Sequence, residues 1–215
     1  MFFFCPLFFC DLCPLFSDLN KRIFELVNSD QLLDKIGGVT VIDKLIDTEY
    51  DENVHVFTRF ANHLRTVLSV GPGTESNVMI LASQALGRLA KASDNLTNDS
   101  LEFEINRALE RLRGERNELR RYGAVLVLKE LAVNAPSLFN QHAKDFFSLI
   151  WTGIRDPKAN VREASIEALR AALQLISERE KTKMTTYEAL YEEAQNGIRF
   201  GKKKKIVTTR AEVLF

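Results

Sequence analysis

Apolar residues recur along this chain at a nearly constant interval. A pair of apolar residues, followed three positions later by another apolar residue, begins at Val41, Ala85, Val127 and Ala168. The intervals between successive pairs are 44, 42 and 41 residues. Steps of three and four place such residues on one face of a helix. The pattern therefore predicts one helix at the same place in each of four units.

A second apolar marker precedes each of these pairs. Leu26, Leu68, Leu112 and Ile154 end segments whose apolar residues also recur at steps of three and four. Each unit is therefore predicted to be a helix, a short turn and a second helix. A period of about 40–47 residues with two helices per unit is typical of HEAT and armadillo repeats. We expect an all-α, right-handed α–α superhelix of about four helix-pair repeats. An ordinary helical bundle is the alternative, which two markers in register over four units disfavour.

The expected units follow one another without long connections. The helix that carries the repeated pair contains small residues, which are expected to let neighbouring backbones approach closely: Gly37, Ala85, Gly123, Ala164 and Ala168. Repeats are predicted within 17–185, at about 17–54, 55–97, 98–137 and 138–180. We expect an apolar leader at 1–16, the start of a further repeat at 186–200, and a basic tail at 201–215.

The turn of the fourth unit has the most specific sequence. Asp156 can cap the turn, and Pro157 both suits the first turn of a helix and stops the helix before it. Arg162 follows at the start of the next helix, and Arg121 recurs 41 residues earlier. Lys35 takes the equivalent place in the first unit. We interpret these charges as structural contacts between repeats or with solvent, and not as catalytic groups.

Two aromatic residues are candidate interface anchors. Tyr122 follows Arg121, and Trp151 belongs to a segment that is apolar nearly all round, with Phe147, Ile150 and Ile154 on its expected face. Aromatic and arginine side chains are enriched among binding hot spots. For both aromatics, burial within the repeats is the favoured interpretation.

No catalytic, cofactor or metal site is expected in this chain. Gly71-Pro72-Gly73 lacks the Lys-Ser/Thr of a phosphate loop, and no protein-kinase signature is present. His55, His63 and His142 fall in different units without ligands at zinc spacing, so we interpret them as ordinary helix histidines. Acidic and basic residues number 29 each, which does not favour nucleic acid as a partner. The three Cys lie within the first 13 residues, which indicates no disulfide framework and a reducing, intracellular setting.

The two ends differ in composition from the repeats. Residues 1–16 lack the charge pattern and cleavage site of a signal peptide and are too few and too interrupted to span a membrane as a helix. We interpret them as a translated intron end, and the lysines at 202–205 as adenine-rich intron after a splice donor. A nuclear-import signal or an anionic-surface site is the alternative for those lysines.

Several segments resemble the start of the HEAT repeats in the target-of-rapamycin (TOR) kinase family. The similarity extends from about Asp18 to Arg199. The segments that carry it are Ile23–Val27 with Gly37 and Gly38, Arg59–Arg65, Ala85–Ala90, Glu102–Glu110, Arg116–Glu118, Ala124–Ala132, and Asp156–Lys158 with Arg162 and Glu163.

The resemblance implies a scaffold and protein-interaction segment. In that family the kinase domain, with its ATP and magnesium, lies far toward the carboxyl end, so no catalysis is expected here. The implied partners are Raptor-like subunits and a second TOR copy in the dimeric complex, without a nucleic acid or small-molecule ligand. The implied location is the cytoplasm, with endomembranes and nucleus in addition. A free-standing HEAT adaptor and a membrane-anchored repeat protein are the alternatives.

Overall fold

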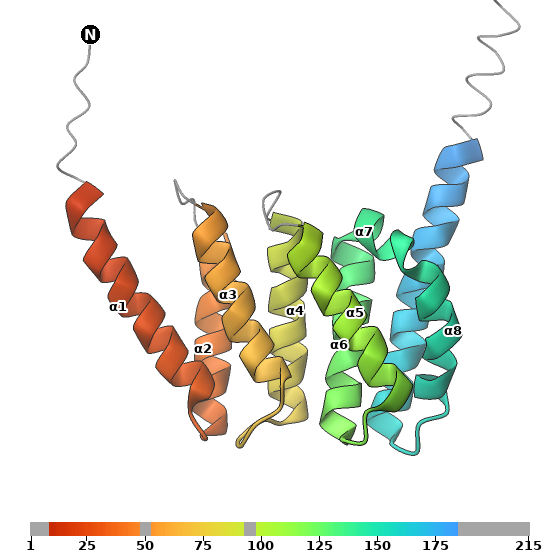
Figure 1. Cartoon of the computed structure of the whole chain (residues 1–215), viewed down its shortest axis with the longest axis horizontal. Helices are drawn as coiled ribbons and strands as arrows, with labels where there is room; N and C mark the ends of the chain where they lie inside the picture. The colour runs from red at the N-terminus through yellow and green to blue at the C-terminus, as the bar shows by residue number, and fades with distance from the viewer. Residues whose placement is uncertain (1–8, 48–52, 93–97, 185–215) are drawn as a thin grey trace, which may run out of the picture. The chain divides into compact units, whose positions relative to one another are not determined.

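A computed structural model describes residues 9–47, 53–92 and 98–184 (Figure 1). The chain divides into two compact units, Met1–Ala172 and Leu173–Phe215. In the second unit the described residues, 173–184, are helical. The expected segments 186–200 and 201–215 lie outside the described residues, as do residues 1–8 of the expected leader.

The described part of the first unit consists of helices without strands, as the sequence predicts. In chain order they are α1 (Phe9–Asn28), α2 (Leu32–Leu45), α3 (Asn53–Leu68), α4 (Ser76–Ala92), α5 (Asn98–Gly114), α6 (Glu118–Asn134), α7 (Pro136–Gln141) and α8 (Ala143–Ile154). Residues 159–172 are also helical. None of the helices in the described residues is both long and apolar enough to cross a membrane.

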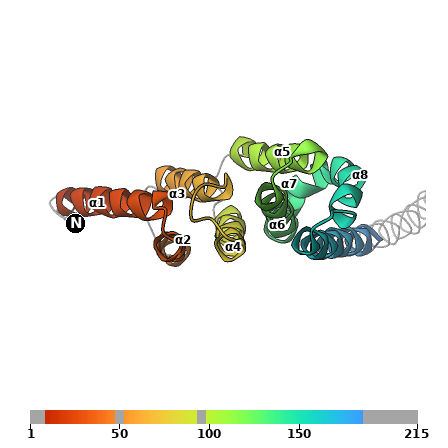
Figure 2. The same cartoon turned by 90° about the horizontal axis from the view of Figure 1, so that it is seen from below.

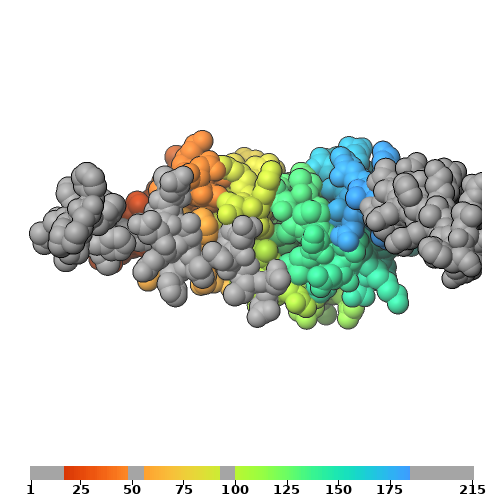
Figure 3. Space-filling model, turned by 90° about the horizontal axis from the view of Figure 1, so that it is seen from above, coloured from red at the N-terminus to blue at the C-terminus, as the bar shows by residue number. Residues whose placement is uncertain are grey.

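These helices form two layers within the first unit. One layer contains α1, α3, α5 and α8, and the other contains α2, α4, α6 and residues 159–172 (Figure 2). The second layer carries the repeated apolar pair. In the space-filling view the colours of this unit run broadly in chain order, from orange through yellow to green and teal (Figure 3). Each pair of helices therefore packs mainly on its neighbours, which is the expected all-α helical repeat.

Apolar side chains from both layers fill the space between them. Phe60 and Leu64 of α3 are fully buried, as are Leu89 of α4 and Leu128 of α6. The predicted small residues Ala85, Ala164 and Ala168 are buried too. The repeated pattern thus marks the helices whose apolar face lies against the other layer.

The close approach predicted at Gly37 is wrong, because the adjacent glycine makes it. A Cβ atom at Gly37 would meet nothing within 4 Å, whereas one at Gly38 would lie 2.9 Å from Cγ1 of Val27 and 3.0 Å from Cβ of Leu26. Each helical residue turns about 100° from the last, so only Gly38 faces α1. At Gly123 of α6 a Cβ atom would collide with the terminal methyl group of the Met79 side chain of α4, so at this position a side chain, and not a backbone, packs against the glycine.

The fourth unit departs from one helix per layer. Its first half contains the short α7, which begins with Pro136 at its amino end, and then α8. The buried face of α8 consists of Phe146, Ile150 and Gly153. The predicted face of Phe147, Ile150 and Ile154 is therefore rotated from the observed one, because Gly153 is the residue that approaches Ser165 of the next helix.

Candidate interaction surfaces

An ion pair between a partly buried arginine and a buried aspartate joins the third repeat to the fourth. Arg121, at the start of α6, donates from Nε to Oδ2 of Asp156 over 2.6 Å and from Nη2 to Oδ1 over 3.1 Å. The same guanidinium donates to the carbonyls of Glu115 and Arg116, over 3.2 and 2.7 Å. One side chain therefore ties the α5–α6 turn to the turn after α8.

The surroundings of this pair stabilise the charged forms of both Arg121 and Asp156. Burial alone would raise the pKa of Asp156, but hydrogen bonds from Arg121 and from the backbone N–H of Lys158 bring that pKa below its usual value. The hydrogen bond to Asp156 raises the pKa of Arg121 against the opposing effect of burial. Both groups are charged at neutral pH, and the contact is a bidentate Arg–carboxylate pair.

The predicted turn residues lie together, but Arg162 and Arg121 have different roles. Arg162 donates from Nη1 to the carbonyls of Asp156 and Pro157, at 2.9 Å each. Arg162 therefore stabilises the turn of its own repeat, while Arg121 makes the contact between repeats. Lys35, the first-unit equivalent, is buried and donates from Nζ to the Val27 carbonyl over 3.0 Å.

Several charged contacts between repeats have no counterpart among the sequence predictions. Arg88 of α4 forms ion pairs of 2.6 Å with Asp43 of α2 and with Asp47 just beyond it. Lys129 of α6 lies 3.0 Å from Glu167. The spacing of 45 residues between Asp43 and Arg88 is close to one repeat, which is the signal in the sequence that could have identified this pair.

The outer layer has a further contact of this kind. Arg65 of α3 pairs with Glu104 of α5, and its guanidinium lies 5.1 Å from the centroid of the Phe103 ring. This arrangement is a cation–π contact beside an ion pair. The contact links the outer helices of the second and third repeats.

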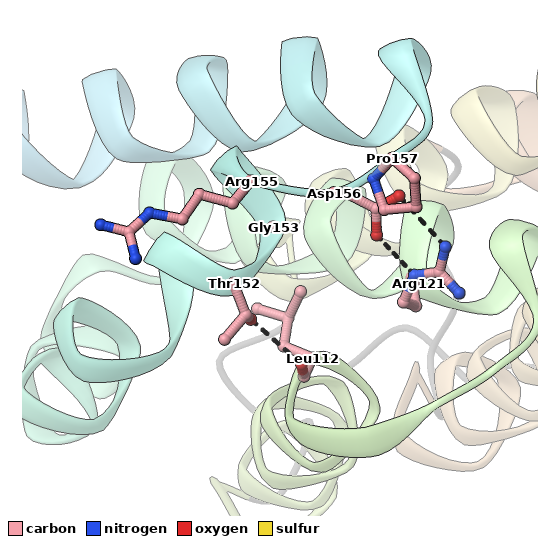
Figure 4. A pocket seen from close by; sticks show the side chains of 7 residues that line it. All are labelled: Leu112, Arg121, Thr152, Gly153, Arg155, Asp156 and Pro157. Atoms are coloured by element: carbon pink, nitrogen blue, oxygen red, sulfur yellow. Dashed lines mark hydrogen bonds and ion pairs between the residues drawn. The ribbon is translucent and has the colours of Figure 1, made fainter.

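Beside the Arg121–Asp156 pair there is a small hollow (Figure 4). Its volume is about 320 Å³, and its lining residues are Leu112, Arg121, Thr152, Gly153, Arg155, Asp156 and Pro157. The Thr152 hydroxyl donates to the Leu112 carbonyl over 3.1 Å. The Arg155 guanidinium lies on the side of the hollow away from Arg121.

A wider groove of about 530 Å³ runs over the helices that carry the repeated pair. It is lined by residues of α2, α4 and α6, namely Val39, Thr40, Asp43, Lys44, Leu81, Gln84, Arg88, Glu130, Val133 and Asn134. Its charges are of both signs, and Arg88 is already paired with Asp43 and Asp47.

The two predicted aromatic anchors have different surroundings. Tyr122 is 9 % exposed, as packing within the repeats requires, and burial raises its pKa. Trp151 is 50 % exposed, so its predicted burial is wrong. The reason is the rotation of α8, which turns Gly153 toward the neighbouring helix and Trp151 toward solvent. An interface role for either residue stays a prediction.

The histidines do not form a site in the described part of the chain. The His63 ring lies 5.8 Å from that of Phe24, and burial and then the charge of Arg59 lower its pKa. His142 ends α7 and lies 3.9 Å from Glu102. The side chain of His55 is outside the described residues. Among the described residues, no group of three or more His, Cys, Asp or Glu is placed to hold a metal ion.

Comparison with known proteins identifies relatives that are named as TOR kinases. The chain is 39% identical over 183 residues to "Serine/threonine-protein kinase TOR" of Arabidopsis thaliana and 38% identical over 184 residues to "Serine/threonine-protein kinase tor1" of Schizosaccharomyces pombe. It is 37% identical over 189 residues to "Serine/threonine-protein kinase mTor" of Drosophila melanogaster. These matches cover 85%, 85% and 86% of the chain but only 7%, 8% and 8% of the relatives. No protein-family model matches the chain.

Proposed function

Because this chain is homologous over most of its length to one segment of the TOR serine/threonine kinases, we propose that it is a HEAT-type scaffold segment of such a kinase. In this proposal the segment contributes binding surface, and phosphoryl transfer, with its ATP and magnesium, belongs to a kinase domain elsewhere in the protein. The observation that carries the proposal is the stack of repeats joined by ion pairs, above all Arg121 with Asp156.

The contacts between repeats explain why such a stack suits a scaffold. Each repeat is joined to the next by a charged contact as well as by apolar packing, as at Arg88 with Asp43 and at Lys129 with Glu167. A stack held in this way presents its exposed helix faces at fixed spacing, which is how repeat proteins form extended binding surfaces.

We propose proteins as the partners of this surface. They are the Raptor-like subunits of TOR complexes and a second copy of the kinase in a dimeric complex, within TOR signalling in growth and nutrient response. The cytoplasm is the proposed location, with endomembranes and the nucleus as further sites. Nucleic acid and small-molecule ligands are not part of the proposal. The mixed charges of the groove over α2, α4 and α6 agree with a protein partner.

Deletion of this segment from the complete kinase tests the proposal. We expect the deleted kinase to lose recovery of the Raptor-like subunit and its own dimerisation, measured by affinity purification and analytical ultracentrifugation. Phosphorylation of a short peptide by its kinase domain should continue. Normal complex recovery by a folded, deleted kinase would contradict the scaffold role.

The isolated chain provides a second, direct measurement. A mixture of the 215-residue chain with a purified Raptor-like subunit should elute as a complex on size exclusion. A variant in which Gly38 is replaced by a bulky leucine, which collides with α1, should elute with less of that complex.

A further inference from the structure

Two adjacent loops of the first unit carry more positive than negative charge. Residues 111–121 and 151–158 contain seven Lys and Arg but three Asp and Glu, although the whole chain has equal numbers. All three carboxylates have partners: Asp156 pairs with Arg121, Glu118 with Lys158 at 3.0 Å, and Glu115 with Arg120 at 3.5 Å. The excess is therefore positive and lies on the remaining arginines.

Three of those arginines are available to an outside ligand. Arg113, Arg116 and Arg155 are exposed, and in the part of the chain that the structure describes no side-chain hydrogen bond or ion pair engages them. We call these three residues the arginine edge.

Contacts between the two loops place the backbones of the arginine edge near one another. Arg113 follows Leu112, whose carbonyl accepts from Thr152 over 3.1 Å. The carbonyl of Arg116 accepts from Arg121 over 2.7 Å, and Arg121 in turn holds Asp156, the neighbour of Arg155. Arg113 and Arg155 are thus each one residue from a bond between the loops, and Arg116 is held by the arginine that makes the second of these bonds.

An exposed tryptophan lies beside the arginine edge. The backbone N–H of Arg155 donates to the carbonyl of Trp151 over 3.2 Å, so the two residues are one helical turn apart and share a face. The hollow of about 320 Å³ is lined by Arg155 and by Thr152, the neighbour of Trp151, with Arg121 on its other side (Figure 4). An aromatic ring beside guanidinium groups and a hollow is the composition of an interface hot spot.

We propose that the arginine edge and Trp151 bind an acidic segment of a protein partner. Carboxylates of that segment pair with Arg113, Arg116 and Arg155, and an apolar side chain packs on the Trp151 ring. The inference rests on the proposed scaffold function, whose partner surface it specifies by charge.

The surrounding charges favour a polypeptide over a nucleic acid. Glu110 and Glu163 are exposed near the two loops in the sequence. A nucleic acid duplex, with one phosphate per ~1.7 Å of its axis, would bring negative charge against them. An acidic polypeptide can place its carboxylates at the arginines alone. The planar guanidinium also fits a carboxylate through two parallel hydrogen bonds.

Trp151 provides the signal that tests this site, because it is the single tryptophan of the chain. The 215-residue chain is titrated with a synthetic peptide of alternating Glu and Leu, and its tryptophan fluorescence is recorded. We expect a saturable change that weakens as salt is raised, because exposed charges are screened. A matched peptide with Gln in place of Glu should bind at least about tenfold more weakly.

Variants of the arginine edge separate this site from the rest of the surface. Arg155→Glu should weaken binding of the Glu–Leu peptide at least about tenfold, with a smaller loss for Arg155→Gln. Arg22→Glu is the matched control, because Arg22 is an exposed arginine of α1 without a side-chain contact given by the structure. The control should bind within about twofold of the unaltered chain. Unchanged melting curves show that all variants are folded.

Several results would overturn the inference. One is binding of the Gln peptide or of oligothymidylate as tight as that of the Glu–Leu peptide, or tighter. Another is an equal loss of peptide affinity in Arg22→Glu and Arg155→Glu. A third is the absence of any fluorescence change on titration with the Glu–Leu peptide. The scaffold function is tested separately. If an Arg113, Arg116 and Arg155 triple reversal still forms the complex with a Raptor-like subunit, the scaffold stands and the acidic site fails. If the acidic peptide binds but no TOR subunit does, the acidic site stands and the scaffold function fails.

Discussion

Adjacent glycines in α2 have opposite surroundings, and this difference predicts opposite effects of the same substitution. A methyl group at Gly38 would meet Val27 and Leu26 of α1 at 2.9 and 3.0 Å. Relief of that contact requires the two helices to separate, so Gly38→Ala should lower the free energy of unfolding by about 1–3 kcal/mol. Denaturant unfolding followed by circular dichroism measures the change.

The neighbouring position is the control for that substitution. A methyl group at Gly37 would meet nothing within 4 Å, and alanine is the better helix former by about 0.5–1 kcal/mol. Gly37→Ala should therefore raise the free energy of unfolding or leave it unchanged. Equal effects at the two positions would show that α1 does not pack on α2 as described.

Asp156 predicts a specific dependence of stability on pH. Its pKa in the folded chain lies below the usual value, so its ionised form is favoured by folding. The stabilisation is complete above the unfolded pKa of about 3.9 and is lost as the pH falls through the lower folded pKa. At pH 7, Asp156→Asn should lower the free energy of unfolding by about 1–3 kcal/mol, because the bond to a charged Arg121 is lost.

The difference in the free energy of unfolding between Asp156→Asn and the unaltered chain should become smaller below about pH 4. Unfolding curves recorded from pH 3 to pH 7 measure it. Asp47→Asn is the control, since the Asp47 side chain is 69% exposed beside Arg88 and exposed pairs contribute about 0–1 kcal/mol. A pH-independent difference at Asp156 would mean that its carboxylate is not the group that stabilises the turn.

Helix starts differ in how they are capped, and this sets a prediction for α6. The side chain of Asn117 accepts from the backbone N–H of Arg120 over 3.2 Å, whereas Gln31 before α2 makes no such bond. Asn117→Ala should cost about 1 kcal/mol, and Asn117→Asp should be nearly neutral. Thermal unfolding measures both. Gln31→Ala serves as the control and should have little effect; an equal loss there would argue against the cap.

The helices could be predicted from the sequence because their apolar residues repeat, and the orientation of single helices could not. The pairs at Val41, Ala85, Val127 and Ala168 all fall in helices of one layer. Which side of a helix approaches its neighbour depends on contacts between segments. For this reason the sequence misplaced the close approach at Gly37 and the buried face of α8, and with that face the exposure of Trp151.

The candidate surface residues likewise divide into those that could be predicted from the sequence and those that could not. A structural role for Arg121 and Asp156 could be predicted from the sequence, because Asp156 lies in the most specific turn and the arginine recurs at the interval of one repeat. Their pairing with each other came from the structure. The pair of Arg88 with Asp43 has such a signal in its spacing of 45 residues, which the sequence predictions did not use. The arginine edge has none, because it depends on which loops lie side by side in space. Charge on an exposed face carries no periodic signal, so only the structure separates the engaged carboxylates from the free arginines.

At the scale of the whole first unit, stability should be greatest in the middle of the stack. Nine residues of α6 and eight of α4 are buried, against four of α2. In the layer of repeated pairs, α4 contacts both α2 and α6. Backbone amides whose helices are covered on both sides open only with the larger unfolding events. Amides of α4 and α6 should therefore exchange more slowly than those of α2, as hydrogen exchange with mass spectrometry can measure.

Removal of one charged contact should change this exchange in a local way. Arg88→Ala deletes the pairs from α4 to Asp43 and Asp47, so exchange in α2 should become faster while that in α6 changes little. Lys129→Ala is the matched variant on the other side, because Lys129 pairs with Glu167; it should leave α2 unchanged and speed exchange in residues 159–172. In a stack where each repeat contacts mainly its neighbours, coupling falls off along the chain. Equal acceleration of all helices by both variants would instead indicate one cooperative core, and the ion pairs would then not act as joints between repeats.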